Sequence, residues 1–234
     1  MKKDKTIISL ILNCLTVVAV LTGIILIFVA PHQSADGLVS ETPISAFRFF
    51  TTDSNVLAAL FAAVFVVYEA LFLAGKAKEI PTFVYVLKSV GTVGVAVTLF
   101  TVLFYLAPFA PGGFLSMFKG RDLFFHLIAP LLSLVSFIFF ENTKKVKFKG
   151  TLWGIVSILL YGIFYAINAF SHAVDGKIPF EYDWYGFAQG GVLFAVIALV
   201  VMISVAYGFS TLLWLANNKL AAKDSILAAN DNEN

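Results

Sequence analysis

The polar residues best suited to chemistry in this chain lie at the start of two apolar segments. One is the stretch Phe-Arg-Phe-Phe-Thr-Thr-Asp-Ser-Asn at positions 47–55, and the other begins near His126. A threonine hydroxyl becomes an effective nucleophile when a base removes its proton, and His126 is the imidazole placed furthest inside the polar zone. These residues therefore favour acyl transfer or hydrolysis, with a threonine as nucleophile and His126 as base.

Neighbouring side chains suit the supporting roles of such a reaction. Asp53 or Asp122 is a candidate to orient the imidazole, because a carboxylate bound to one ring nitrogen leaves the other free as the base. Arg48 or Asn55 is a candidate to stabilise a developing oxyanion. Asp122 and His126 are four residues apart, so we expect them on one face of a helix.

A proline follows this histidine by about one helical turn. Pro130 cannot donate a hydrogen bond to the carbonyl four residues earlier, which belongs to His126. We expect the backbone to kink there and to leave an unpaired acceptor beside the imidazole. Ser133 continues the same face deeper into the segment.

Two other uses of these polar groups stay open. The histidines are His32, His126 and His172, and a haem held between the last two is conceivable. A hydrolytic metal site would need more histidine and carboxylate ligands, so we expect no metal and no cofactor. The other use involves no reaction, as in a channel, transporter or scaffold that binds an ion or a lipid. The chain has no evident internal repeat, which disfavours a typical secondary transporter.

The composition places the whole chain in a membrane. Of its 234 residues 60% are hydrophobic and only 13% are charged, and the mean hydropathy is +0.92. A soluble domain of this length could not bury so much apolar surface, so the bilayer must be the solvent. The net charge of +2 comes without a basic cluster among aromatics, which argues against nucleic acid as a partner. A lone cysteine, Cys14, excludes an internal disulfide and a cysteine-based zinc site.

Six apolar runs are long enough to cross a bilayer as helices. We place them at Thr6–Ala30, Thr51–Ala74, Thr82–Ala107, Leu123–Phe140, Thr151–His172 and Ala188–Ala216. The first is longer than the apolar part of a signal peptide, and we expect it to be a retained helix. The prediction is an all-α polytopic protein with one six-helix domain over residues 1–216 and a polar, fraying tail over 217–234.

The distribution of basic residues predicts the orientation, since cytoplasmic loops carry the excess of lysine and arginine. One side collects Lys2, Lys3, Lys5, Lys76, Lys78, Lys144, Lys145, Lys147, Lys149, Lys219 and Lys223, and the other only Arg48, Lys119, Arg121 and Lys177. We therefore expect a plasma-membrane protein with both termini in the cytoplasm. Residues 47–55 then lie at the outer face.

Several segments place polar residues on one helical face near that outer side. If a helix begins at Thr42-Pro43, with threonine as cap and proline in the first turn, one stripe contains Arg48, Thr51, Thr52 and Asn55. The third segment contributes Thr98, Thr101 and Tyr105, and the fifth contributes Tyr161, Tyr165, Asn168 and His172. Together these faces predict a polar chamber that opens to the outer leaflet.

Two further groups have a structural interpretation. Glu69 and Lys88 lie near the cytoplasmic ends of consecutive segments, where they either form an ion pair or extend to the inner interface. Tyr182, Trp184 and Tyr185 precede the last segment, and we interpret them as an outer aromatic belt, with a lid as the alternative.

Three motifs carry a resemblance to a known family. They are the aromatic-aromatic-Thr-x-x-x-Asn element at 49–55, the His-x-x-x-Pro element at 126–130 and the Pro-aromatic-acidic loop at 179–185. With six spans, this pattern resembles the androgen-induced-gene-like membrane proteins and their bacterial relatives. Animal members are intramembrane threonine hydrolases of fatty acid esters of hydroxy fatty acids, and bacterial members with this pattern generally have no established activity.

The resemblance assigns roles to particular residues. The threonine after the aromatic pair is Thr51, with the adjacent Thr52 as the alternative nucleophile, and the histidine before the proline is His126. The implied substrate is a membrane lipid or lipid-like ester, with its acyl chains among apolar side chains and its carbonyl at the polar groups. The oligomeric state is not indicated.

Overall fold

The computed structural model describes residues 3–29, 42–142 and 146–230, which form helices and loops without a β-strand. The helices cover Lys3–Val29 (α1), Pro43–Arg48 (η1), Phe50–Leu73 (α2), Thr82–Thr101 (α3), Val102–Leu106 (η2), Ala107–Phe109 (η3), Phe114–Phe118 (η4), Arg121–Leu123 (α4), Phe124–Ile128 (η5), Ala129–Val135 (α5), Ser136–Phe140 (η6), Phe148–Ile155 (η7), Val156–Ser171 (α6) and Val192–Asn230 (α7). Of the short ones, η2, η5 and η6 are π-helical, and η1, η3, η4 and η7 are 3₁₀-helical.

Six helical runs among the described residues are long and apolar enough to cross a membrane, which confirms the all-α, six-span prediction. They are Lys3–Val29, Phe50–Leu73, Thr82–Phe109, Arg121–Phe140, Phe148–Ser171 and Val192–Asp224. Five of the six begin and end within three residues of the predicted positions. Agreement is this close because apolar length alone defines a helix that spans hydrocarbon.

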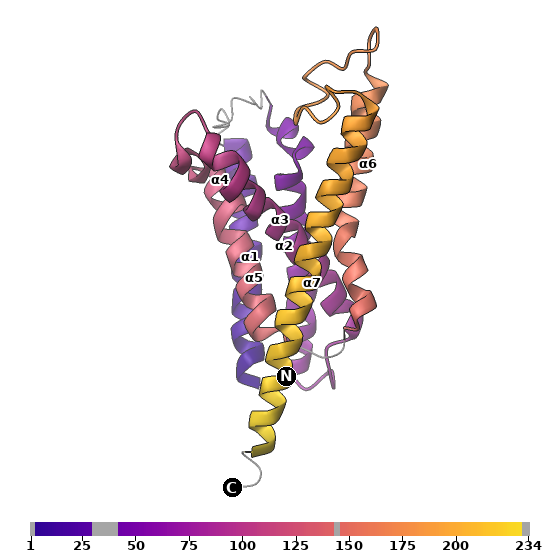
Figure 1. Ribbon diagram of the computed structural model, residues 1–234. Coiled ribbons are helices and arrows are strands. Elements are labelled where there is room, and N and C mark those ends of the chain that lie inside the picture. The colour runs from indigo at the N-terminus through magenta and orange to yellow at the C-terminus, as the bar shows by residue number, and fades with distance from the viewer. Residues whose placement is uncertain (1–2, 30–41, 143–145, 231–234) are drawn as a thin grey trace.

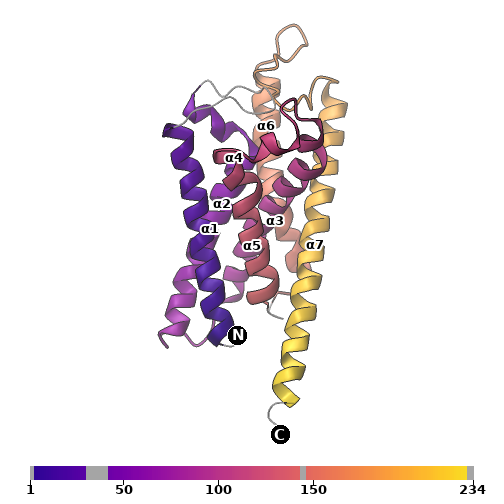
Figure 2. The same ribbon diagram turned by 90° about the vertical axis from the view of Figure 1, so that its left-hand side faces the viewer.

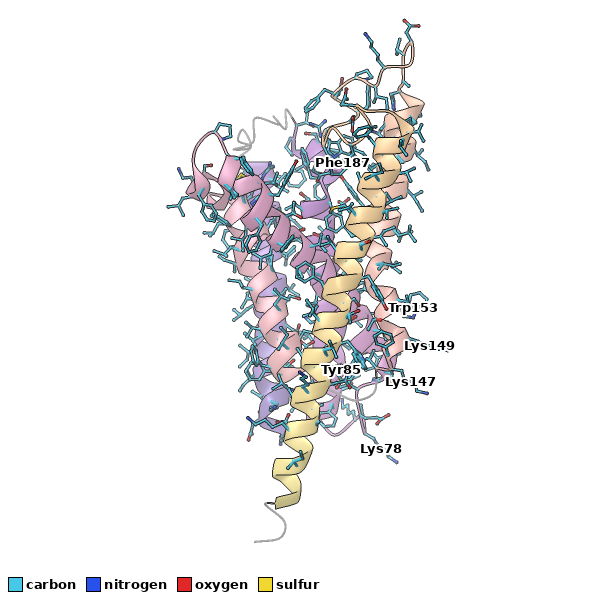
Figure 3. The ribbon with its side chains drawn as sticks, in the orientation of Figure 1. Lys78, Tyr85, Lys147, Lys149, Trp153 and Phe187 are labelled. Atoms are coloured by element: carbon cyan, nitrogen blue, oxygen red, sulfur yellow. The ribbon has the colours of Figure 1, made fainter. Side chains whose placement is uncertain are left out.

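The spans form one upright bundle in which consecutive helices run in opposite directions (Figures 1 and 2). The start of α1 and the end of α7 lie at the same end of the bundle, here called the terminal end. Lys78, Lys147 and Lys149 also lie at this end, whereas Phe187 lies at the opposite, distal end (Figure 3). Lysines predicted to share one side therefore do so, although Lys2, Lys144 and Lys145 fall outside the described residues.

The last helix differs most from its prediction. It begins at Val192 rather than Ala188, because the chain first turns through Gly191 at a φ of +82°, which a glycine adopts without strain. It also continues to Asn230, so residues 217–230 extend the helix and do not form the separate frayed tail that was expected. The end of the first predicted span, Ala30, lies outside the described residues.

Burial is uneven across the bundle. In the most apolar stretch of Thr82–Phe109, 67% of the residues are buried, against 6% in that of Val192–Asp224. The third span is therefore central and the sixth peripheral. Gly91 permits the close contact between α2 and α3, because a Cβ at this position would lie 2.9 Å from the Ala58 Cα.

Candidate functional site

The segment before Thr51 starts as predicted and then breaks. The Thr42 hydroxyl accepts a hydrogen bond from the Ser45 amide at 3.3 Å, and Pro43 opens the first turn. That turn is a separate 3₁₀ helix, η1, because the backbone becomes extended at Phe49 (φ −89°, ψ 134°) before α2 begins. The predicted continuous stripe is therefore wrong for Arg48, which lies on a different helix from Thr51.

Asn55 connects α2 to the segment that carries His126. Its fully buried amide nitrogen donates to the Thr51 carbonyl at 2.8 Å and to the Phe125 carbonyl at 3.0 Å. Both amide hydrogens are then in use, so this side chain has no donor left for an oxyanion. In this arrangement Asn55 offers no free N–H for the predicted oxyanion role. Its role is to hold the start of α2 against the residue that precedes His126.

His126 is buried, and its tautomer follows from a backbone contact. The Nδ1 atom lies 2.7 Å from the carbonyl oxygen of Met117 in η4. A carbonyl oxygen can only accept, so Nδ1 carries a hydrogen, and in the neutral ring Nε2 then holds the lone pair. The backbone carbonyl of Met117 thus orients the imidazole, a role that was predicted for the carboxylate of Asp122 or Asp53. Sequence reasoning missed it because a backbone carbonyl has no residue type to recognise.

Asp122 and Asp53 have other surroundings. Asp122 is buried and lies 3.5 Å from the Arg121 Nε, as an ion pair of neighbouring residues. Asp53 is half-buried in the first turn of α2, where its amide donates to the Phe49 carbonyl at 3.2 Å. A carboxylate in the first turn is favoured by the positive end of the helix dipole.

The expected backbone distortion at the proline is present as a widened turn. Residues Phe124–Ile128 form the π-helical η5, and Pro130 lies in the first turn of α5 directly after it. In η5 the Ala129 amide donates to the Phe124 carbonyl, five residues back. A π turn adds one residue to the helix and often marks a functional site. His126 is the central residue of this turn.

The two threonines differ in burial. Thr52 is 5% exposed and faces the bundle on the same side as Asn55, whereas Thr51 is half-buried. Among the described residues, no hydrogen bond joins either hydroxyl to the His126 ring. The Thr51 backbone is thus fixed close to Phe125, while contact between its hydroxyl and the imidazole is not formed.

Helix α6 and the loop before α7 form a second polar group, here called the aromatic cap. It comprises Tyr161 and Tyr165 of α6 and Asp183, Trp184 and Tyr185 of the loop. The Tyr161 hydroxyl donates to the Arg48 carbonyl at 2.6 Å and accepts from the Trp184 Nε1 at 3.1 Å. The Tyr185 hydroxyl accepts from the Phe50 amide at 3.1 Å. The cap thereby fixes the start of α2.

The buried carboxylate of Asp183 holds the cap loop together. It accepts from the Tyr165 hydroxyl, from the Ala188 amide at 3.1 Å and from the Gln189 side chain at 2.8 Å. Trp184 is only 3% exposed. The belt interpretation is therefore wrong for Trp184, which packs inside the distal end.

Arg48 joins the cap through its guanidinium group. The Cζ atom lies 5.2 Å from the Phe49 ring centre and 5.6 Å from the Trp184 ring centre, within cation–π range. The buried Nε has no hydrogen-bond partner among the described residues. The arginine is thus a charged donor that the protein itself does not fully use.

The remaining predicted residues are not joined to His126. Asn168 donates to the Tyr182 carbonyl at 3.3 Å, and the exposed His172 stacks on the Tyr182 ring at 3.8 Å. His172 thus lies against the surface loop, whereas His126 is buried against Met117. His32, the third histidine, lies outside the described residues. No group of three or more His, Cys, Asp or Glu within the described ranges is arranged to hold a metal ion.

The polar stripe predicted for the third span is divided. Thr98 is buried and its hydroxyl is 2.9 Å from that of Ser54, but Tyr105 is 67% exposed. The π-helical η2, which contains Tyr105, changes the register after Thr101 and turns that ring outwards. A hollow at Tyr85 and another along the loop near Lys177 do not include Thr51 or His126. The hydrogen bonds of the predicted polar residues described above are distributed over separate contacts.

Comparison with known proteins adds no assignment, because no protein-family model, curated protein or solved structure matches the chain.

Proposed function

We propose that this protein is an intramembrane hydrolase of a lipid ester, of the type formed between a fatty acid and a hydroxy fatty acid. Thr51 is the nucleophile and His126 the general base. The observation that carries the proposal is the hydrogen bond from His126 Nδ1 to the Met117 carbonyl. It keeps the imidazole in the tautomer whose Nε2 can accept a proton.

The proposed reaction has two steps. The His126 Nε2 takes the Thr51 hydroxyl proton while the Oγ1 attacks the ester carbonyl. As the C–O bond to the hydroxy fatty acid breaks, the imidazolium protonates the departing alkoxide oxygen, which leaves as the free hydroxyl. Water, activated by the same nitrogen, cleaves the acyl-threonine and releases the fatty acid. A neutral carbonyl stabilises an imidazolium less than a carboxylate does, so turnover is expected to be slow.

Arg48 supplies a second recognition element for such a substrate. An ester of a hydroxy fatty acid carries one free carboxylate, and the guanidinium between Phe49 and Trp184 has an unused Nε–H. A charged hydrogen bond from arginine to a carboxylate is stronger than a neutral one. The Thr51 hydroxyl and the imidazole then come into contact when substrate binds, as catalytic hydrogen bonds often do.

The proposal includes an orientation. With the terminal end in the cytoplasm, where its lysines are favoured, the Thr51–His126 pair lies in the outer leaflet of the plasma membrane. Labelling of an engineered cysteine at exposed Asp175, in a Cys14→Ser background, tests this with a membrane-impermeant thiol reagent. Reaction in intact cells supports the orientation, and reaction only after lysis contradicts it.

The enzymatic test uses purified protein in nanodiscs with a panel of lipid esters. Thr51→Ala and His126→Ala are each expected to reduce turnover by about 10²–10⁴-fold, the range that general-base catalysis contributes. Thr52→Ala is the matched control and should retain activity. Loss in Thr52→Ala alone would move the nucleophile by one residue, and unchanged turnover in both principal variants would refute the mechanism.

A non-enzymatic membrane protein that binds a lipid or an ion is the second candidate. The observation in its favour is that Asn55 uses both amide hydrogens on backbone carbonyls, which is a structural arrangement. Wild-type protein that retains lipid through purification but turns over no ester in the panel would favour this function.

A further inference from the structure

A second set of polar side chains is buried near the terminal end, far along the bundle from the aromatic cap. Its members come from α1, α2, α3, α5 and η6, together with the residue after η6, and each is at most 1% exposed. This buried network comprises Ser9, Asn13, Glu69, Lys88, Thr92, Ser133, Ser136 and Glu141. The proposed hydrolysis uses none of them.

Glu141 is the centre of the network. Its Oε1 accepts from the Ser136 hydroxyl at 2.5 Å, from the Asn13 amide at 2.9 Å and from the Ser9 hydroxyl at 3.4 Å. The same oxygen lies 3.8 Å from the Lys88 Nζ. One carboxylate oxygen therefore holds three helices together.

Glu69 and Lys88 complete the charge balance. The Asn13 amide lies 3.4 Å from the Glu69 Oε2, and Glu69 interacts electrostatically with both Glu141 and Lys88. The Lys88 Nζ lies 3.4 Å from the Ser133 hydroxyl. Neither Glu69 nor Lys88 extends to the interface, and the ion pair of the lysine goes to Glu141, not to the predicted Glu69. Two acids and one amine leave the network with one negative charge in excess.

The network also has fewer hydrogen-bond donors than acceptors. Three of its oxygens, Asn13 Oδ1, Glu69 Oε1 and Glu141 Oε2, are buried without a hydrogen-bond partner in the described structure, and all three are acceptors. The two hydrogens of the Asn13 amide are shared among Ser9, Glu69 and Glu141. Unpaired acceptors and uncompensated charge are both costly inside a membrane. One added proton removes the excess charge. It also reduces the shortage of donors, since the protonated oxygen becomes a donor that can bind one of the other unpaired acceptors.

We propose that Glu69 and Glu141 share one bound proton beside Lys88, which makes the buried network a proton-binding site within the membrane. Within the described part of the chain, a further titratable side chain near the site is Tyr85 of α3, which interacts electrostatically with both acids. From α1, α5 and η6 the neighbours are serine and asparagine side chains, which do not titrate.

A small hollow lies beside this site. Tyr85 lines a small hollow with Ser89, Thr151 and Asn217, and it lies inside the lower part of the bundle (Figure 3). The Asn217 amide also donates to the Glu141 carbonyl at 3.2 Å. Through Asn217, the hollow is therefore connected to the backbone of the residue at the centre of the site.

Infrared difference spectroscopy of purified full-length protein tests the proposal, because a protonated carboxyl has a carbonyl stretch that an ionised one lacks. Spectra are recorded across a pH titration, in choline chloride and in sodium chloride. The wild type is expected to keep a protonated-carboxyl band at neutral pH that shifts in heavy water. Glu69→Gln and Glu141→Gln should each abolish it, because one remaining acid ionises beside Lys88. Glu181→Gln, which changes an exposed acid, is the matched control.

Lys88→Met provides a second readout that does not depend on losing an acid. Without the positive neighbour, ionisation of a carboxyl becomes less favourable, so the band should persist to higher pH than in the wild type. A band that survives in both glutamine variants would overturn the proposal. A band that sodium removes with release of a proton would also overturn it, by identifying a metal cation as the occupant.

Discussion

The two ends of the bundle satisfy their polar groups in different ways. At the distal end, Asn55 and His126 bind backbone carbonyls, and the Asp183 carboxylate accepts from three donors. At the terminal end, two acids and a lysine are buried with more acceptors than donors. An imidazole whose Nδ1 donates to a carbonyl can accept a proton from a substrate at Nε2. A buried network with more hydrogen-bond acceptors than donors can instead bind and keep a proton.

The largest expected effect comes from removing the single cation of the buried network. Lys88→Met leaves the one negative charge that remains on Glu69 and Glu141 without a countercharge, and breaking a buried ion pair costs about 3–5 kcal/mol of unfolding free energy. The loss should shrink as the pH falls, because binding of a second proton neutralises that charge. Denaturant unfolding in detergent at neutral and acidic pH measures both effects.

The double variant Lys88→Met/Glu141→Gln is the control for this prediction. It removes the cation together with one acid and should recover part of the lost stability at neutral pH. Equal destabilisation of the single and double variants would show that the charge balance is not what stabilises this end.

At the distal end, Asn55→Ala should cost about 2 kcal/mol, because it leaves the Thr51 and Phe125 carbonyls without their shared donor. The effect should not depend on pH, in contrast to Lys88→Met. Ser54→Ala is the control on the same helix, since it removes a hydroxyl contact with Thr98 and a second donor to the Thr51 carbonyl but leaves the Phe125 carbonyl bound. The same unfolding assay applies, and equal losses in the two variants would contradict the connecting role of Asn55.

Much of the fold could be predicted from the sequence, because span length, turn residues and lysine distribution are local properties. The cap at Thr42 and the disturbance before Pro130 were predicted on the same basis. The sites were harder, since one residue of extended backbone at Phe49 separates Arg48 from Thr51. Likewise, a π turn rotates Tyr105 out of the stripe that begins at Thr98. Helical spacing assumes a regular helix, and it fails at such breaks.

The buried network shows a different limit. Glu141 follows the apolar run and is next to Asn142 and the lysines after it, so its position is typical of a solvent-exposed loop. It is nevertheless fully buried, because η6 ends where Ser136 and Asn13 can bind its carboxylate. Because the sequence does not indicate that Glu141 is buried, Glu69 was the acid predicted as the partner of Lys88. Contacts between residues 128 positions apart carry no local signal.

The smallest expected effect tests whether the aromatic cap depends on hydrogen bonds or on packing. Tyr161→Phe removes a donor to the Arg48 carbonyl and an acceptor for the Trp184 Nε1–H but keeps the ring contact with Phe50. The expected loss is about 1 kcal/mol, the net value of an ordinary hydrogen bond. Tyr105→Phe is the control, because that hydroxyl lies on an exposed side chain. If Tyr161→Phe matches this control in stability, ring packing alone holds the cap, and Arg48 is positioned by its two aromatic neighbours. A measurable loss instead makes the Tyr161 hydroxyl the contact by which the cap fixes Arg48, and the hydrolysis of carboxylate-bearing esters should then weaken in the same variant.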